Sequence, residues 1–151
     1  MVSLRPIDDS NRAAVEALRV APGQEQFVSG VAESLLEAAR EPDGRPICWA
    51  VYLGGTPIGF VMIADDVASP DYIPQYLWKL LIDERYQGRG FGTATLDLVV
   101  EYFRGRPSVE VVTTSAGQGE GSPIGFYERY GFERTGEIWF DEEVLLRLEL
   151  R

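Results

Sequence analysis

The chain has 151 residues, a formal net charge of −10, one cysteine and no histidine. This length fits a single domain over residues 1–151, and the lone cysteine excludes an intrachain disulfide. The absence of histidine excludes histidine-based triads and most zinc sites, the acidic charge argues against nucleic acid, and no apolar run approaches the about 20 residues of a membrane span. We therefore expect a cytoplasmic protein without a bound metal and without nucleic-acid or membrane partners.

The first half of the chain carries the patterns of strands, helices and a hairpin. Alternating apolar residues favour strands, and apolar residues at helical spacing favour helices. Two β-rich runs surround the Gly54-Gly55 pair, which is typical of a β-hairpin. The expected elements are a strand at 2–7, helices at 11–20 and 24–40, and strands at 47–53 and 56–64.

The second half alternates strands with helices. A mostly apolar run predicts a buried strand, a glycine-dense loop follows it directly, and a turn is expected around Thr135-Gly136. Helices between strands indicate a mixed α/β (α+β) class. The expected elements are strands at 76–83, 109–114 and 144–150 and helices at 93–103 and 124–130.

The loop RYQGRGFGT, residues 85–93, invites a phosphate-binding interpretation. A dinucleotide fingerprint does not fit, because Thr93 stands where its third glycine belongs, and the Gly-Lys-Ser/Thr of a P-loop is absent. Glycines nevertheless let successive N–H groups turn toward an anion, and the following helix begins with unpaired N–H groups. A tight turn that needs glycine for geometry alone remains the alternative.

Two stretches carry a family resemblance. LLIDERYQGRGFGT resembles the acetyl-CoA motif of the GCN5-related N-acetyltransferases (the GNAT family), and GFYERYGFERTGE resembles a later segment of the same family. The order of elements agrees along essentially the whole chain. Within the family, DDSNRAAVEALRV near the start and LLIDERYQG resemble bacterial spermine/spermidine acetyltransferases. The resemblance implies a mixed, mostly antiparallel sheet of about six to seven strands, splayed between strands 4 and 5 and flanked by about four helices.

The resemblance also implies acetyl-CoA as co-substrate and a place for it. The pantetheine arm would lie against the backbone of Leu80, Leu81 and Ile82. Ser122 would contact the coenzyme, or would only cap the following helix. The pyrophosphate would lie on the N–H groups of Gln87, Gly88, Arg89, Gly90, Phe91, Gly92 and Thr93.

Tyr127 matches the family's tyrosine acid, which protonates the leaving thiolate; an ordinary core aromatic is the alternative. A phenol with a pKa of about 10 can protonate a thiolate whose conjugate acid has a pKa near about 8.5. The base stays open, because Trp78 occupies the position where relatives that acetylate polyamines often place a glutamate. Carboxylates acting through water, or desolvation of the amine, are the alternatives.

The implied reaction is direct transfer of an acetyl group from acetyl-CoA to the amine of a small molecule such as spermidine or spermine, through a tetrahedral intermediate. A homodimer is expected from the resemblance. The alternatives are a non-catalytic acyl-CoA-binding regulatory module and a family member acting on an antibiotic amine or a protein N-terminus. Candidate substrate-binding residues, each of which could also be an ordinary solvated side chain, are Glu25, Glu33, Asp65, Tyr76 and Trp78.

Overall fold

The computed structural model describes residues 1–139 and 142–151. Seven strands form one sheet in the order β1-β2-β3-β4-β5-β7-β6. Short 3-10 turns at Pro42–Gly44 and Glu84–Tyr86 connect some of the elements. In chain order the elements are β1 (Val2–Pro6), α1 (Arg12–Glu16), α2 (Val31–Arg40), β2 (Pro46–Leu53), β3 (Thr56–Ala64), β4 (Tyr76–Ile82), α3 (Phe91–Arg104), β5 (Val111–Ala116), α4 (Ile124–Tyr130), β6 (Glu133–Ile138) and β7 (Val144–Glu149).

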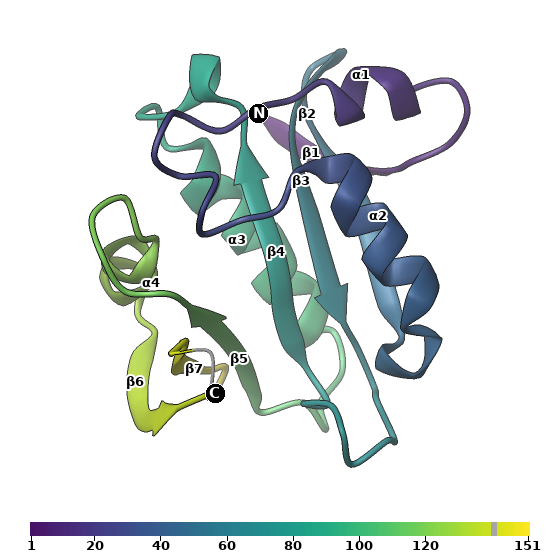
Figure 1. Ribbon diagram of the computed structural model, residues 1–151. Coiled ribbons are helices and arrows are strands. Elements are labelled where there is room, and N and C mark those ends of the chain that lie inside the picture. Colours follow the sequence, from purple (N-terminus) through teal and green to yellow (C-terminus); the bar gives the residue numbers. More distant parts are fainter. Residues whose placement is uncertain (140–141) are drawn as a thin grey trace.

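Helices cover both faces of the sheet, so two apolar cores form (Figure 1). The core under α3 and α4 is the larger and includes Phe103, Leu96 and Leu146. The core under α1 and α2 includes Val15, Val31 and Phe60. The apolar stripe of each long helix supplies these contacts, as the sequence pattern predicted. Among the described residues, no helix combines the length and apolar character needed to cross a lipid bilayer.

The sheet opens between β4 and β5, as expected from the resemblance. These strands are parallel and pair at Tyr76↔Thr113 and Leu77↔Thr114, the start of the visible divergence of the two ribbons (Figure 1). All other strand pairs are antiparallel. The mixed, mostly antiparallel architecture with four helices is therefore confirmed.

A β-bulge interrupts β4 just beyond this point. Met62 of β3 pairs with Lys79 while Ile63 pairs with Leu77, so Trp78 is the extra residue. A bulge shifts the alternation of side chains and bends the strand. Leu77 and Leu80 accordingly both contact the core under α3, and Trp78 contacts the core under α1 and α2.

Two expected elements differ from the structure. The predicted helix at 24–40 begins only at Val31, because Gly30 is its extended N-cap and the preceding residues form turns. Phe27 lies over Gly117 and Gly121 instead of on a helical face. The predicted turn at 135–136 lies within β6, where Gly136 has φ +91° and the register to β7 shifts. The turn residues thus produce a bulge in an edge strand.

Candidate active site

A cavity of about 620 Å³ lies beside the open edge of β4. Its walls come from the end of β4, the glycine loop, the start of α3, α4 and the segment before α2. Ten of the residues that the sequence assigned to coenzyme binding or catalysis line this cavity: Leu80, Ile82, Gln87, Gly88, Gly90, Phe91, Gly92, Thr93, Ser122 and Tyr127.

Two of the predicted coenzyme residues do not line it. Leu81 is 2% exposed and packs in the core under α1 and α2, because neighbouring strand residues point to opposite faces. The guanidinium of Arg89 lies 5.8 Å from the centre of the Tyr86 ring. Conversely, Phe27 and Arg129 line the cavity, and the sequence analysis missed them. The only signal for Arg129 was its position two residues after Tyr127 on a short helix.

The three glycines of the loop are needed for two different reasons. Gly88 and Gly90 have φ of +76° and +84°, the left-handed region that side chains disfavour. A Cβ on Gly92 would come within 3.2 Å of the Phe126 ring, so this glycine permits close packing of α3 on α4. The first intrahelical bond of α3 runs from the Ala94 N–H to the Gly90 carbonyl. The N–H groups that precede Ala94 therefore have no intrahelical acceptor and line the cavity as potential anion donors.

Side chains anchor the loop to the rest of the molecule. The buried Asp83 carboxylate accepts hydrogen bonds from the Arg19 N–H at 3.0 Å and from the Arg85 Nε at 2.7 Å. Burial by itself raises the pKa of Asp83, but these hydrogen bonds outweigh it and lower the pKa below its usual value. The amide of Gln87 donates to the Ile82 carbonyl at 2.8 Å and to Gln24 at 2.9 Å. The guanidinium of Arg85 is therefore already paired with a carboxylate of the protein.

Tyr127 lines the cavity and is 5% exposed. Burial raises the pKa of its phenol to about 12, and a hydrogen bond with Thr114 lowers it by a smaller amount. Thr114 donates its own proton to the Leu77 carbonyl at 2.9 Å. Because burial holds the pKa of the phenol well above 7, the phenol stays protonated at neutral pH, as a proton-donating acid must.

Ser122 connects the loop before α4 to the helix itself. Its hydroxyl donates to the Gly117 carbonyl at 2.5 Å and accepts from the Ile124 N–H at 3.2 Å. Pro123 is the N-cap of α4, so Ser122 binds the first helical N–H from one residue before the cap. The residue also lines the cavity, so a contact with the coenzyme remains compatible with it.

A second cavity has a volume of about 590 Å³. It is lined by the first half of β4, the end of α2, the loop after β3, the end of β6 and the start of β7. Tyr76 and Trp78, two of the predicted substrate-binding residues, line this cavity. Two further aromatics, Tyr72 and Trp139, complete an aromatic wall, with Tyr72 6.3 Å from Trp78 and Trp139 6.0 Å from Tyr76 between ring centres. The carboxylates that line it are Glu37, Glu41, Asp71, Glu137 and Glu143, and the one lining cation of the described residues is Lys79.

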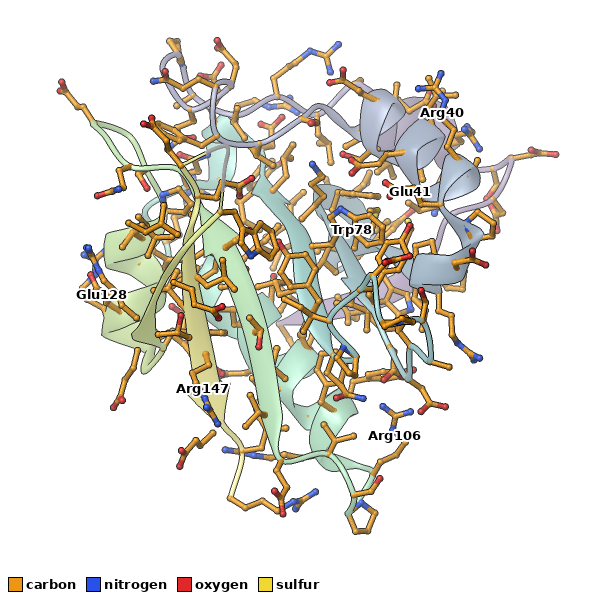
Figure 2. The ribbon with its side chains drawn as sticks, turned by 60° about the horizontal axis from the view of Figure 1, so that its bottom comes forward. Arg40, Glu41, Trp78, Arg106, Glu128 and Arg147 are labelled. Carbon is orange, nitrogen blue, oxygen red and sulfur yellow. The ribbon has the colours of Figure 1, made fainter. Side chains whose placement is uncertain are left out.

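The other three predicted substrate residues lie elsewhere. Glu25 and Glu33 line a separate cavity of about 440 Å³ beside α1 and the start of α2. Asp65 is 5% exposed and binds Arg106 and the Tyr102 hydroxyl, the latter at 3.0 Å. In Figure 2, Arg106 lies near the lower edge of the molecule and Trp78 near its centre. The structure therefore does not bring these acids to the cavity that contains Tyr76 and Trp78.

The part of the chain that forms the first cavity also matches a known protein family. The model of the acetyltransferase (GNAT) family matches residues 23–132, which include the glycine loop and Tyr127. The chain belongs to the acetyltransferase (GNAT) family. As a GNAT enzyme it is an acetyl-CoA-dependent N-acetyltransferase, which agrees with the expectation from the sequence.

Individual relatives extend along the whole GNAT domain. A spermine/spermidine N(1)-acetyltransferase from Bacillus subtilis (strain 168) is 26% identical over 155 residues, covering 99% of this chain and 99% of its own. Among solved structures, aminoglycoside acetyltransferase AAC(6')-Ib in complex with coenzyme A has a TM-score of 0.76 at 18% identity, covering 99% of this chain and 95% of that chain. The PaiA N-acetyltransferase from Thermoplasma acidophilum, also with coenzyme A, has a TM-score of 0.67 at 14% identity, covering 99% of each chain.

Proposed function

We propose that this GNAT enzyme acetylates a primary amine of a polyamine such as spermidine or spermine. The observation that carries the proposal is the second cavity, whose described lining residues include five carboxylates, one ammonium group and four aromatic side chains. Carboxylates and aromatic faces both attract alkylammonium groups. A chain with several ammonium groups can engage several of these carboxylates together, whereas a monoamine can engage few of them.

The first cavity supplies the place for acetyl-CoA. Its donors are the free N–H groups at the start of α3, and Arg129 adds a positive charge at its wall. The edge of β4 that faces the gap supplies backbone groups for the pantetheine arm. Asp83 N–H donates to Ile58 of β3, so strand alternation directs the backbone groups of Leu80 and Ile82 toward the gap. These features fit a diphosphate with an extended arm.

The two cavities share β4, and this arrangement supports direct transfer. The first cavity, called the acyl-CoA cavity below, contains Leu80 and Ile82. The second, called the acidic cavity below, contains Tyr76 and Trp78 of the same strand. An amine bound among the acids would attack the thioester where β4 and β5 separate. Tyr127, which lines the first cavity, would give its proton to the thiolate of coenzyme A.

Detection of released thiol with a panel of amines tests the proposal. We expect activity with spermidine and spermine, weaker activity with monoamines, and a KM for spermidine that rises with salt because charge attraction is screened. Higher kcat/KM with an aminoglycoside or a peptide N-terminus would overturn the polyamine assignment. Coenzyme A binding without thiol release on any amine would instead support a regulatory module. The homodimer remains a prediction that light scattering can test.

A further inference from the structure

The proposed function leaves one step without a residue: the removal of a proton from the attacking amine. An alkylammonium group has a pKa of about 10.4, so at neutral pH it must lose a proton before it can attack. The acidic cavity contains a chain of hydrogen bonds that can take this proton away. It runs from Tyr76 on β4 through Ser115 on β5 to Glu143, which precedes β7.

The direction of this chain follows from its donors. Ser115 donates its only proton to the Glu143 Oε1 at 2.8 Å. The Tyr76 hydroxyl lies 2.5 Å from the Ser115 Oγ, so Tyr76 must be the donor of that bond. Each hydroxyl therefore passes its proton toward the carboxylate. Tyr76 and Glu143, the two ends of this chain, both line the acidic cavity.

This chain of hydrogen bonds lies at the junction of β4 and β5, where the acetyl transfer is proposed to occur. Thr114 and Ser115 are neighbours on β5 and point to opposite faces, as successive strand residues do. Thr114 is buried and donates to the Leu77 carbonyl, on the face of the sheet that packs against the core containing Tyr127. Ser115 binds Tyr76 on the side of the acidic cavity. The contacts of Thr114 and of Ser115 thus both lie where β4 and β5 pair, just before the two strands separate.

We propose that Tyr76, Ser115 and Glu143 form a proton relay that deprotonates the acceptor amine, an inference that rests on the proposed acetyl transfer. The amine N–H bond breaks as an O–H bond forms on Tyr76, Tyr76 passes its own proton to Ser115, and Ser115 passes its proton to the Glu143 carboxylate. The result is a neutral amine and a protonated Glu143, which returns the proton to solvent. Tyr76 is the catalytic residue, and Ser115 and Glu143 act through it.

Other ionisable groups face the same cavity, so an experiment must separate them from the relay. Glu37 and Glu41 come from α2 and its end, Asp71 from the loop after β3, Lys79 from β4 and Glu137 from β6. Tyr72 also lines the cavity, with its hydroxyl bound to Glu41. Glu37 is the main competitor as a base, although its carboxylate already binds Trp78 and Lys79. Glu37→Gln therefore serves as the competing variant, and Glu128→Gln, on the surface of α4 and paired with Arg134, as the control for loss of charge.

The test measures kcat for spermidine from pH 6 to 10 in Tyr76→Phe, Ser115→Ala and Glu143→Gln. We expect each variant to lose about 100-fold in kcat at pH 7 and to recover as pH rises and hydroxide replaces the relay. The double variant Ser115→Ala/Glu143→Gln should lose no more than either single variant, because both interrupt one path. Ser115→Thr, which keeps a hydroxyl, should retain the wild-type profile, and so should Glu128→Gln, whose carboxylate lies outside the cavity.

A less basic acceptor distinguishes proton removal from a merely structural role. A spermidine analogue with two fluorines on the carbon beside its terminal amine has a much lower amine pKa, so a larger fraction is unprotonated at neutral pH and we expect the variants to lose much less kcat with it than with spermidine. Coenzyme A binding and thermal unfolding check that each variant is folded. Equal losses for both acceptors at every pH, or a profile that changes only in Glu37→Gln, would overturn the relay. A wild-type protein that binds coenzyme A and acetylates no amine would overturn the proposed function itself.

Discussion

Trp78 and Lys79 are consecutive residues of β4, and both donate to the carboxylate of Glu37 on α2. The Trp78 Nε1 lies 3.1 Å from one oxygen and the Lys79 Nζ 3.3 Å from the other. Successive residues of a regular strand point to opposite faces, so this pairing depends on the bulge at Trp78. The bulge thereby joins α2 to the opening strand and brings a carboxylate beside a strand position that itself carries tryptophan.

Glu41 tests whether the acidic cavity binds a polycation. Its carboxylate accepts the Tyr72 hydroxyl at 3.0 Å at the wall of the cavity, near Trp78 (Figure 2). We expect Glu41→Gln to raise the KM for spermidine roughly 3- to 10-fold at low salt and less at high salt, because one attractive charge is lost. The matched control is Glu128→Gln on α4, whose carboxylate pairs with Arg134 on the surface. Equal KM changes in the two variants would contradict the proposed cavity.

Tyr127→Phe tests the acid. Removal of the phenol should lower kcat about 100-fold at pH 7 while coenzyme A still binds, since the ring keeps its place in the core. Tyr130→Phe is the control, because it removes a hydroxyl from the same helix whose partner is Asp97 at 2.7 Å. Since burial raises the pKa of Tyr127 to about 12, the phenol stays protonated and we expect no loss of kcat from its ionisation up to about pH 10. A Tyr127→Phe variant with the wild-type kcat would exclude the acid role.

Gly90→Ala tests the anion-binding loop. Gly90 has φ +84° at the N-cap of α3, and Gly54 has φ +60° in the β2–β3 hairpin. An alanine in the left-handed region costs about 1 kcal/mol at either position. We expect both variants to lose comparable stability in urea unfolding, but only Gly90→Ala to weaken coenzyme A binding in calorimetry. Unchanged affinity in Gly90→Ala would indicate that this glycine serves the turn alone.

Asp83→Asn tests the anchor of the loop and predicts a pH dependence. The hydrogen bonds from Arg85 and Arg19 hold the pKa of Asp83 below its unfolded value. The stabilisation is therefore present above the unfolded pKa of about 3.9 and is lost as the pH falls through the folded pKa. We expect Asp83→Asn to lower the free energy of unfolding by about 2 kcal/mol at pH 7. The difference from wild type should shrink below about pH 4, and a constant difference down to pH 2 would contradict this assignment.

Local sequence was sufficient for several features of the site. Gly88 and Gly90 indicated a loop of special backbone geometry, and Gly131, with φ +128°, ends the helix that carries Tyr127. The apolar stripes of α2 and α3 and the Gly54-Gly55 hairpin were predicted for the same reason. Each of these signals depends on backbone conformation or on a period within a few residues, which the order of amino acids determines directly.

The segment at residues 24–30 shows where prediction from local sequence fails. Its apolar residues fit a helical stripe, yet Phe27 packs over glycines near residue 120. This contact between segments about 90 residues apart exists only after the sheet has formed, so no local pattern reports it. The same holds for Asp65, which directly follows β3 and is paired with Arg106 and Tyr102, about 40 residues away in the sequence.

The sequence alone determined the class of the domain, the glycine loop at the end of a buried strand and the tyrosine on the short helix after it, because these follow from periodicity, turn chemistry and motif. Only the tertiary structure decided which acids gather around Trp78 and how Tyr76, Ser115 and Glu143 are connected. Those residues come from separate strands and loops, and their distances are set by the register of the sheet and the bulge in β4. Register is a cooperative property of the packed sheet, so it is not encoded in any single stretch of the chain.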